Sequence, residues 1–119
     1  MIRKDLDISI QWENLKRQLE VIIGKKPADL NGVLFLIGVQ ELGQGHKVFS
    51  KEEKQDLIHL GVCKVLSQDG FYHLHGSDKD GWPIWKVVQK IPHLTLSEQE
   101  KLLKINVIEY FTKELNLDL

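Results

Sequence analysis

The chain contains one helix-length segment, from Asp29 to Leu42, that has no polar face. Its apolar side chains are Leu30, Val33, Leu34, Phe35, Leu36, Ile37, Val39 and Leu42. A helix that is apolar all round has to be covered by other elements. The apolar run of about thirteen residues is interrupted by Gly32 and Gly38 and falls short of the roughly twenty residues needed to cross a bilayer. We therefore expect a buried helix over about residues 29–42, with the other helices packed round it.

A buried strand over residues 33–39 is the alternative, because periodicity alone does not separate a strand from a helix in an apolar run. The length of the segment and its ending, Gln40-Glu41-Leu42-Gly43, favour the helix. Gly32 and Gly38 would then let a neighbouring helix approach closely, since glycine carries no side chain.

The N-terminal part of the chain has the period of an amphipathic helix. Apolar residues recur there at steps of three and four, at Ile8, Trp12, Leu15, Leu19 and Ile22. This spacing places them on one face of a helix over about residues 7–23. Asp7 or Ser9 can cap its start. Gly24, followed by Pro27, ends it.

Two capping boxes predict the starts of two further helices. Ser50-Lys51-Glu52-Glu53 has a serine and a glutamate that satisfy each other's backbone amides, and it opens a helix over about residues 51–69. Gly70 supplies the stop of that helix. Ser97-Glu98-Gln99-Glu100 repeats the pattern before a helix over about residues 98–115.

Between these two helices lies an aromatic segment that predicts a β-hairpin over about residues 71–88. Phe71-Tyr72-His73-Leu74-His75 has the composition of a strand, and residues 82–88 are its partner. The turn is Gly76-Ser77-Asp78-Lys79-Asp80-Gly81. The sequence as a whole therefore predicts a mainly α, four-helix bundle-like single domain over residues 1–119. Its apolar helix is central, and its small hairpin precedes the last helix.

Charge composition bears on the class of partner. At 119 residues the chain has the size of one domain. Its 16 basic and 17 acidic residues give a net charge of −1, which provides no field to attract a phosphate backbone. Only Arg3 and Arg17 carry the guanidinium that suits phosphates. We therefore expect neither nucleic acid nor a membrane as the main partner.

A single cysteine, Cys63, cannot form an internal disulfide, so a reducing compartment fits the chain. Near the N-terminus, Asp5 and Asp7 stand where a signal peptide would have its apolar run. These features indicate a cytoplasmic protein.

One candidate site is a metal site made by His59, Cys63, His73 and His75. His59 and Cys63 are four residues apart on a helix, and His73 and His75 alternate along a strand, so each pair points one way. The spacing matches no regular zinc framework. The alternative is that Cys63 belongs to the apolar core and that the histidines decorate the surface.

The sequence gives little support for an enzyme. Cys63 lies inside a helix among apolar residues, whereas a catalytic cysteine needs partial exposure and a group that lowers its pKa. Asp78-Lys79-Asp80-Gly81 resembles the start of a calcium loop, but it lacks the later ligands and is explained as a turn. We expect no catalytic residue and no cofactor.

The remaining candidate is a binding surface made by Tyr72, Trp82, Trp85 and Lys86. Alternation along a strand would place Trp82 and Trp85 on opposite faces, one buried and the other exposed. Aromatic residues are enriched at the centres of protein interfaces, so we expect a non-enzymatic protein-interaction module. Its partner is an unknown protein or a second copy of the chain. Two alternatives remain: weak nucleic-acid binding by an aromatic-lysine surface, and tryptophans that only cover a small core.

Three segments resemble a group of small uncharacterised bacterial proteins, a family whose domain has no known function. The segments are residues 34–43 (LFLIGVQELG), 49–57 (FSKEEKQDL) and 78–83 (DKDGWP), and the likeness extends from about residue 30 to 112. The resemblance implies a standalone bacterial cytosolic protein. It implies no reaction, ligand or site residue.

Overall fold

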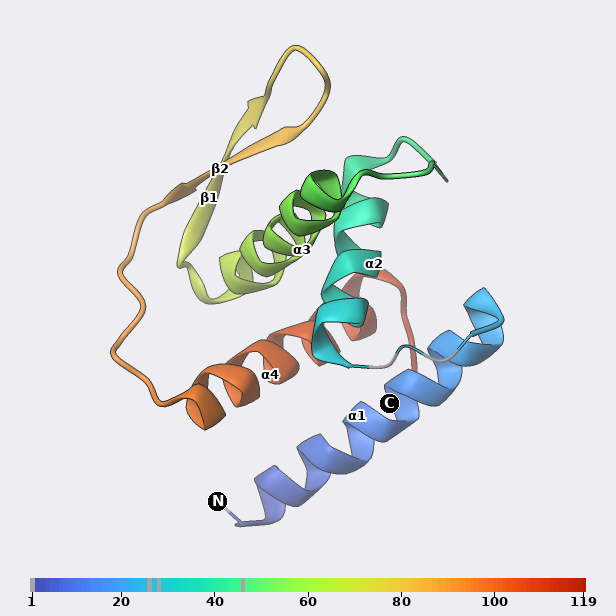
Figure 1. Cartoon of the computed structure of the whole chain (residues 1–119). Coiled ribbons are helices and arrows are strands. Elements are labelled where there is room, and N and C mark those ends of the chain that lie inside the picture. The colour runs from blue at the N-terminus through green and yellow to red at the C-terminus, as the bar shows by residue number, and fades with distance from the viewer. Residues whose placement is uncertain (1, 26, 28, 46) are drawn as a thin grey trace. The chain divides into compact units, whose positions relative to one another are not determined.

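The computed structural model describes residues 2–25, 27, 29–45 and 47–119, with residues 2–6 described by their backbone alone. The described chain is mainly α, with four helices and an antiparallel hairpin before the last helix, as the sequence predicts (Figure 1). The elements are α1 (Ile2–Ile23), α2 (Leu30–Leu42), α3 (Lys51–Leu66), the 3₁₀ turn η1 (Ser67–Asp69), β1 (Tyr72–Ser77), β2 (Pro83–Val87) and α4 (Leu96–Glu114). No helix in these ranges has the length and apolar character to span a bilayer.

The chain divides into two compact units. One unit contains α1 and α4, the two ends of the chain, and the other contains α2, α3 and the hairpin, which are continuous in sequence. Within the second unit α2 packs against α3.

Two glycines allow the backbones of α2 and α3 to come into close contact. A Cβ atom on Gly38 of α2 would lie 2.0 Å from the carbonyl oxygen of Leu57 on α3. A Cβ atom on Gly61 of α3 would lie 2.3 Å from the carbonyl oxygen of Leu34 on α2. The two contacts are reciprocal, and no other residue type fits either position without moving a helix. The close approach expected at Gly38 is therefore confirmed.

The core of this unit lies between α2, α3 and the loop that joins them. Its buried cluster consists of Leu42, Phe49, Leu57 and Leu60. The rings of Phe35 and Phe49 meet edge to face, with their centroids 6.2 Å apart. Five residues of α2 are fully buried and form one stripe: Val33, Leu34, Ile37, Gly38 and Leu42. Its other apolar side chains, Leu30, Phe35, Leu36 and Val39, are half-buried.

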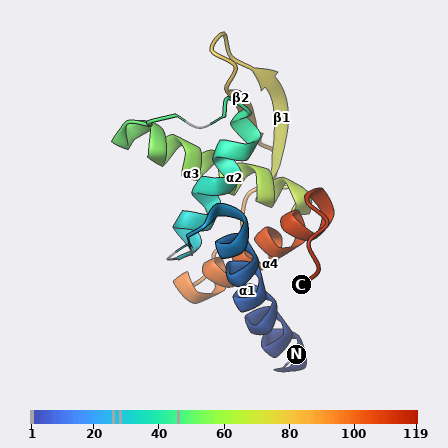
Figure 2. The same ribbon diagram turned by 90° about the vertical axis from the view of Figure 1, so that its right-hand side faces the viewer.

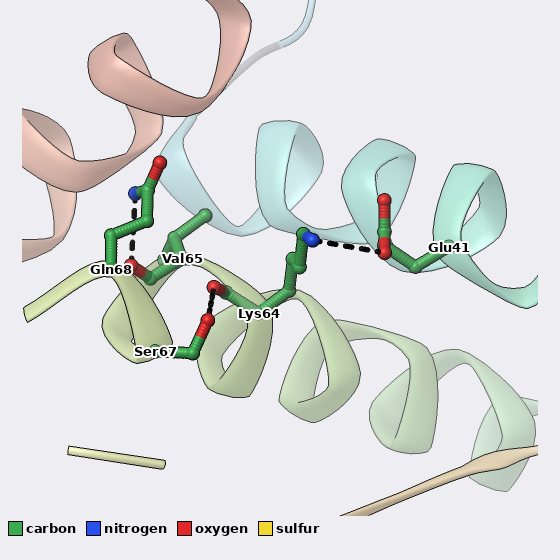
Figure 3. Close-up of polar contacts among 5 residues, drawn as sticks. All are labelled: Glu41, Lys64, Val65, Ser67 and Gln68. Atoms are coloured by element: carbon green, nitrogen blue, oxygen red, sulfur yellow. Dashed lines mark hydrogen bonds and ion pairs between the residues drawn. The ribbon is translucent and has the colours of Figure 1, made fainter. Parts of the chain in front are cut away.

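Polar contacts join α2 to α3 and close the C-terminal end of α3 (Figure 3). Lys64 Nζ lies 3.6 Å from Glu41 Oε1 on α2. The Ser67 hydroxyl donates to the carbonyl of Lys64 at 2.6 Å, and the Gln68 amide donates to the carbonyl of Val65 at 2.9 Å. Both side chains thereby bind carbonyl groups in the last turn of the helix, where regular backbone partners run out.

The unit formed by α1 and α4 joins the two ends of the chain by side-chain contacts. Trp12, Leu15 and Leu19 are buried on α1, as the sequence predicts. Lys104 Nζ of α4 lies 5.2 Å from the centre of the Trp12 ring. Gln18 of α1 donates to the carbonyl of Asp118 at 2.7 Å.

Helix α1 ends at Ile23 as predicted, but it begins earlier and its last turn is exposed. It begins at Ile2 instead of about residue 7, because Arg3, Lys4 and Leu6 are good helix formers and nothing in the sequence interrupts them. Ile22, expected in the core, is 61% exposed. The buried stripe therefore ends at Leu19, before the last turn of the helix.

Helix α4 begins two residues earlier than predicted, at Leu96 instead of residue 98. Its cap is Thr95, whose hydroxyl accepts from the Glu98 amide at 3.1 Å while the Glu98 carboxylate accepts from the Thr95 amide at 2.9 Å. The sequence contains two overlapping capping boxes, and the upstream box adds helical backbone hydrogen bonds that the downstream box would leave unmade. Ser97, the predicted cap, lies inside the helix.

The hairpin has the predicted order and a bulge. Its partners are Tyr72 with Val87, His73 with Lys86, Leu74 with Trp85, and Ser77 with Pro83, and the register shifts between Leu74 and Ser77. Pro83 begins β2, a position where a strand tolerates a missing amide. Both strands contact α3, and the two views show the hairpin beside that helix (Figures 1 and 2).

Candidate functional site

An open groove of about 490 Å³ lies between α3 and the hairpin. Its lining from α3 is Glu53, Asp56, His59, Leu60 and Cys63, and its lining from the hairpin is Asp78, Asp80, Trp82, Pro83 and Trp85. All ten residues belong to the unit formed by residues 29–93. The groove therefore brings together two segments that are each continuous in sequence.

The α3 side of the groove follows from helical spacing. Glu53, Asp56, His59, Leu60 and Cys63 are separated by steps of three, three, one and three, which places them along one face. The capping box fixes where this face begins, because the Ser50 hydroxyl accepts from the Glu53 amide at 3.1 Å. The Glu53 carboxylate accepts in turn from the Ser50 amide at 2.9 Å.

The hairpin side is held by the carboxylate of Asp78. One of its oxygens accepts from the backbone amides of Asp80 and Trp82, each at 2.9 Å. The Asp78 amide also donates to the carbonyl of Trp82 at 2.8 Å. The tip is tied to the loop after α2, where the Gln44 side chain donates to the carbonyl of Asp80 at 2.9 Å. The turn is thus the architectural feature that the sequence predicts.

Trp82 and Trp85 both pack against the core cluster formed by Leu42, Phe49, Leu57 and Leu60. The expectation that they lie on opposite faces of a strand is wrong, because Trp82 precedes β2 and strand alternation does not apply to it. Both side chains are half-buried. The indole Nε1 of Trp85 is buried and has no hydrogen-bond acceptor among the described residues. Leaving such a donor unpaired costs roughly 1–3 kcal/mol.

The groove is lined by acidic residues. Glu53, Asp56, Asp78 and Asp80 contribute carboxylates, and no lysine or arginine is found among the described residues that line the groove. Hydrogen bonds from the backbone and the side chain of Ser50 lower the pKa of Glu53 from its usual value, which favours the ionised carboxylate. Lys47 contributes the smallest of the effects that lower this pKa, and it does not line the groove.

The His59 side chain contacts both Cys63 and Tyr72. His59 Nε2 lies 3.5 Å from Cys63 Sγ, and the His59 and Tyr72 rings are edge to face with centroids 6.5 Å apart. Burial raises the pKa of the Cys63 thiol from 9.0 to about 11, and burial followed by the nearby Cys63 raises the pKa of Tyr72. Cys63 is therefore a thiol at neutral pH, the form that is a poor nucleophile.

The structure places the four candidate metal ligands in two pairs. His59 contacts Cys63, whereas the rings of His73 and His75 contact each other, with centroids 5.4 Å apart. Within the described ranges, no three or more histidine, cysteine, aspartate or glutamate side chains are grouped as a metal site would need. The reason is local: His73 and His75 point the same way along an exposed strand, while Cys63 is buried in α3.

The strand register separates Lys86 from the three aromatic residues of the predicted binding surface. Trp82 and Trp85 line the groove, and Tyr72 contacts His59. Lys86 is exposed opposite His73, and it follows Trp85 directly in β2, so its side chain points to the other face of the strand. The aromatic residues are thus accompanied by carboxylates and not by lysine.

Sequence reasoning missed Glu53 and Asp56 as site residues and explained Asp78 and Asp80 by turn chemistry alone. A signal for the first two exists in the spacing Glu53, Asp56, His59, which predicts one polar helix face. Nothing in the sequence alone indicates that this face lies opposite the hairpin turn.

A second open groove, of about 560 Å³, lies between α1 and α4. Its lining mixes apolar residues such as Ile8 and Ile105 with charges of both signs, including Glu109 and Lys113. It has no concentration of one charge or of aromatic rings, so the groove beside the hairpin is the stronger candidate. No protein-family model, curated protein or solved structure is significantly similar to this chain.

Proposed function

We propose that this protein is a small interaction module that binds a protein partner in the groove between α3 and the hairpin. The observation that supports the proposal is the pair of half-buried tryptophans, Trp82 and Trp85, that line the groove. Tryptophan has a large apolar surface and is enriched among the residues that contribute most to binding at protein interfaces. A partner that covered the exposed parts of both rings would remove that surface from water.

The rest of the hairpin supports the same proposal. Leu74, Ile84, Val87 and Val88 are all exposed apolar residues on or beside the two strands. Of these, Leu74 and Val87 lie on the same face of the hairpin as Trp85, and exposed apolar side chains beside a groove are typical of an interaction site. A cytoplasmic location is part of the proposal, since Cys63 is a buried free thiol and a reducing compartment would keep it reduced.

The charge of the groove favours a protein partner over nucleic acid. Stacking platforms for single strands combine aromatic rings with basic residues that neutralise phosphates. Here the rings of Trp82 and Trp85 share the groove with four carboxylates, which would repel a phosphate backbone.

The test is selection from a display library of random peptides, followed by nuclear magnetic resonance of the full chain with each selected peptide. We expect selected peptides to shift the indole N–H signals of Trp82 and Trp85. Trp12, on α1, is the internal control and should keep its signal, because it lies in the other unit. Selected peptides that shift only the Trp12 signal, or a selection that yields no binder, would contradict the proposal.

A further inference from the structure

We infer that the occupant of the groove is an extended, basic protein segment that inserts a lysine or arginine side chain between the carboxylates and the tryptophans. The inference rests on the proposed function and identifies its partner class. The occupant is a peptide segment, and the experiment below distinguishes it from a free polyamine.

The groove has a local concentration of negative charge. The whole chain is nearly neutral, with 16 basic and 17 acidic residues, so four carboxylates without a cation among ten lining residues are a local concentration. A groove lined by one sign of charge attracts a partner of the opposite sign and orients it during encounter. A basic segment is the complement of this lining.

The four carboxylates of the groove differ in whether the fold already holds them by hydrogen bonds. Glu53 is fixed by the capping box, and Asp78 is fixed by the two amides of the turn. Asp56 and Asp80 are exposed, and within the described ranges no cation pairs with the carboxylate of either residue. Two charges are thus held in place by the fold, and two others are available to a ligand.

The rings of Trp82 and Trp85 line the same groove as these charges. A lysine ammonium or an arginine guanidinium binds favourably over the face of tryptophan, and such contacts strengthen when they are partly shielded from water. The protein already contains this contact elsewhere, since Lys104 Nζ lies 5.2 Å from the centre of the Trp12 ring. Among the described residues that line the groove, Trp82 and Trp85 have no such cation beside them.

A peptide and a free polyamine differ in the groups that they can bring to the groove. Trp82 and Trp85 present the exposed parts of their rings in the groove, beside the carboxylates. A peptide segment can cover this ring surface with its own side chains while a lysine or arginine meets the carboxylates, whereas a protonated polyamine has only short aliphatic links between its charges. A basic peptide therefore complements both the charge and the rings of the groove.

The experiment is isothermal titration calorimetry of the full chain with a blocked nine-residue peptide of alternating arginine and alanine. The matched peptide has glutamine in place of arginine, and spermidine is the polyamine probe. We expect the arginine peptide to bind at least about tenfold more tightly than the glutamine peptide and than spermidine, and to weaken as salt screens the charges.

The protein variants use the two carboxylates without a structural role. Asp56→Asn combined with Asp80→Asn should raise the Kd of the arginine peptide about five- to tenfold, because each exposed charge pair contributes modestly. The control is Glu20→Gln combined with Glu52→Gln, which removes two exposed carboxylates outside the groove lining and should change the Kd less than about twofold. Trp85→Phe, which replaces the indole by a smaller ring that binds a cation less strongly, should weaken binding by a few-fold as well.

Equal binding of the two peptides, tighter binding of spermidine, or an unchanged Kd in the Asp56 and Asp80 variant would each overturn the inference. Its failure is distinguishable from failure of the proposed function. Neutral library peptides that shift the Trp82 and Trp85 signals would leave the interaction module standing and exclude the basic segment. A library without binders would remove both.

Discussion

Single residues set the distance between the two helices that support the groove. Gly38 and Gly61 each face a backbone carbonyl of the opposite helix, at a separation that leaves no room for a Cβ atom. Helix α3 provides one wall of the groove and packs against α2. The two glycines therefore also determine the positions of the α3 residues that line the groove. The apolar length of α2 predicts a buried helix, but the reciprocal partner Gly61 is found only when both helices are seen together.

Replacing Gly38 by alanine should therefore destabilise the protein. Alanine gains roughly 1 kcal/mol of helix propensity over glycine, but its Cβ would lie 2.0 Å from the Leu57 carbonyl oxygen and force the helices apart. Overpacking of this kind typically costs about 1–3 kcal/mol, and contact with backbone is at the upper end, so we expect a net loss of about 2 kcal/mol. The measurement is the free energy of unfolding in urea. The control is Gln40→Ala at an exposed position of α2, and a Gly38→Ala protein as stable as this control would show that the helices are not in close contact.

At the scale of single elements, the start of α4 offers a choice between two sequence signals. Thr95 and Glu98 form one capping box, and Ser97 and Glu100 spell another two residues later. The structure uses the first. Sequence rules recognise each box equally well, because the rule describes four residues and not the helix that follows.

Alanine substitutions distinguish the two caps directly. Thr95→Ala should cost about 1 kcal/mol of stability, because it leaves a helix N-terminal amide without its acceptor. Ser97→Ala should be neutral or slightly stabilising, since alanine has the higher helix propensity inside a helix. The measurement is thermal unfolding of the two variants, monitored by circular dichroism. A larger loss for Ser97→Ala than for Thr95→Ala would place the start of the helix where the sequence first suggested.

The sequence predicts elements better than it predicts the site, for a physical reason. The Ser50 capping box, the apolar run of α2 and the Asp-Gly turn are local signals, and each corresponds to a feature of the structure. The site depends on which faces meet. Trp82 and Trp85 could be recognised by type, but not their shared position on one core cluster, because Trp82 lies outside the strand. Asp56 and Asp80 become partners of these rings only through packing of the hairpin on α3, which no local pattern records.

At the scale of the whole molecule, the length of the chain predicts one domain, while the structure divides into two compact units. The unit formed by residues 29–93 is continuous and contains its own core cluster and the entire groove. The unit formed by α1 and α4 needs both ends of the chain, held by contacts such as Asn14 Nδ2 to the Leu119 carbonyl at 3.3 Å. Closing the long loop between them carries an entropic cost that the continuous unit does not have.

We therefore expect a fragment of residues 29–93 to fold without α1 and α4. A core of this size rarely supplies more than about 3–5 kcal/mol, so the fragment should be less stable than the full chain but still unfold cooperatively in urea. Its folding can be followed by helical circular dichroism and by the indole N–H signals of Trp82 and Trp85, which should retain their dispersion and their response to selected peptides. Gly38→Ala in the fragment is the matched control, since it should lower the free energy of unfolding by about 2 kcal/mol, as in the full chain, if the contact between α2 and α3 holds the fragment together. A fragment that is disordered without the variant would show instead that residues 1–119 fold as one cooperative domain, as the length alone predicts.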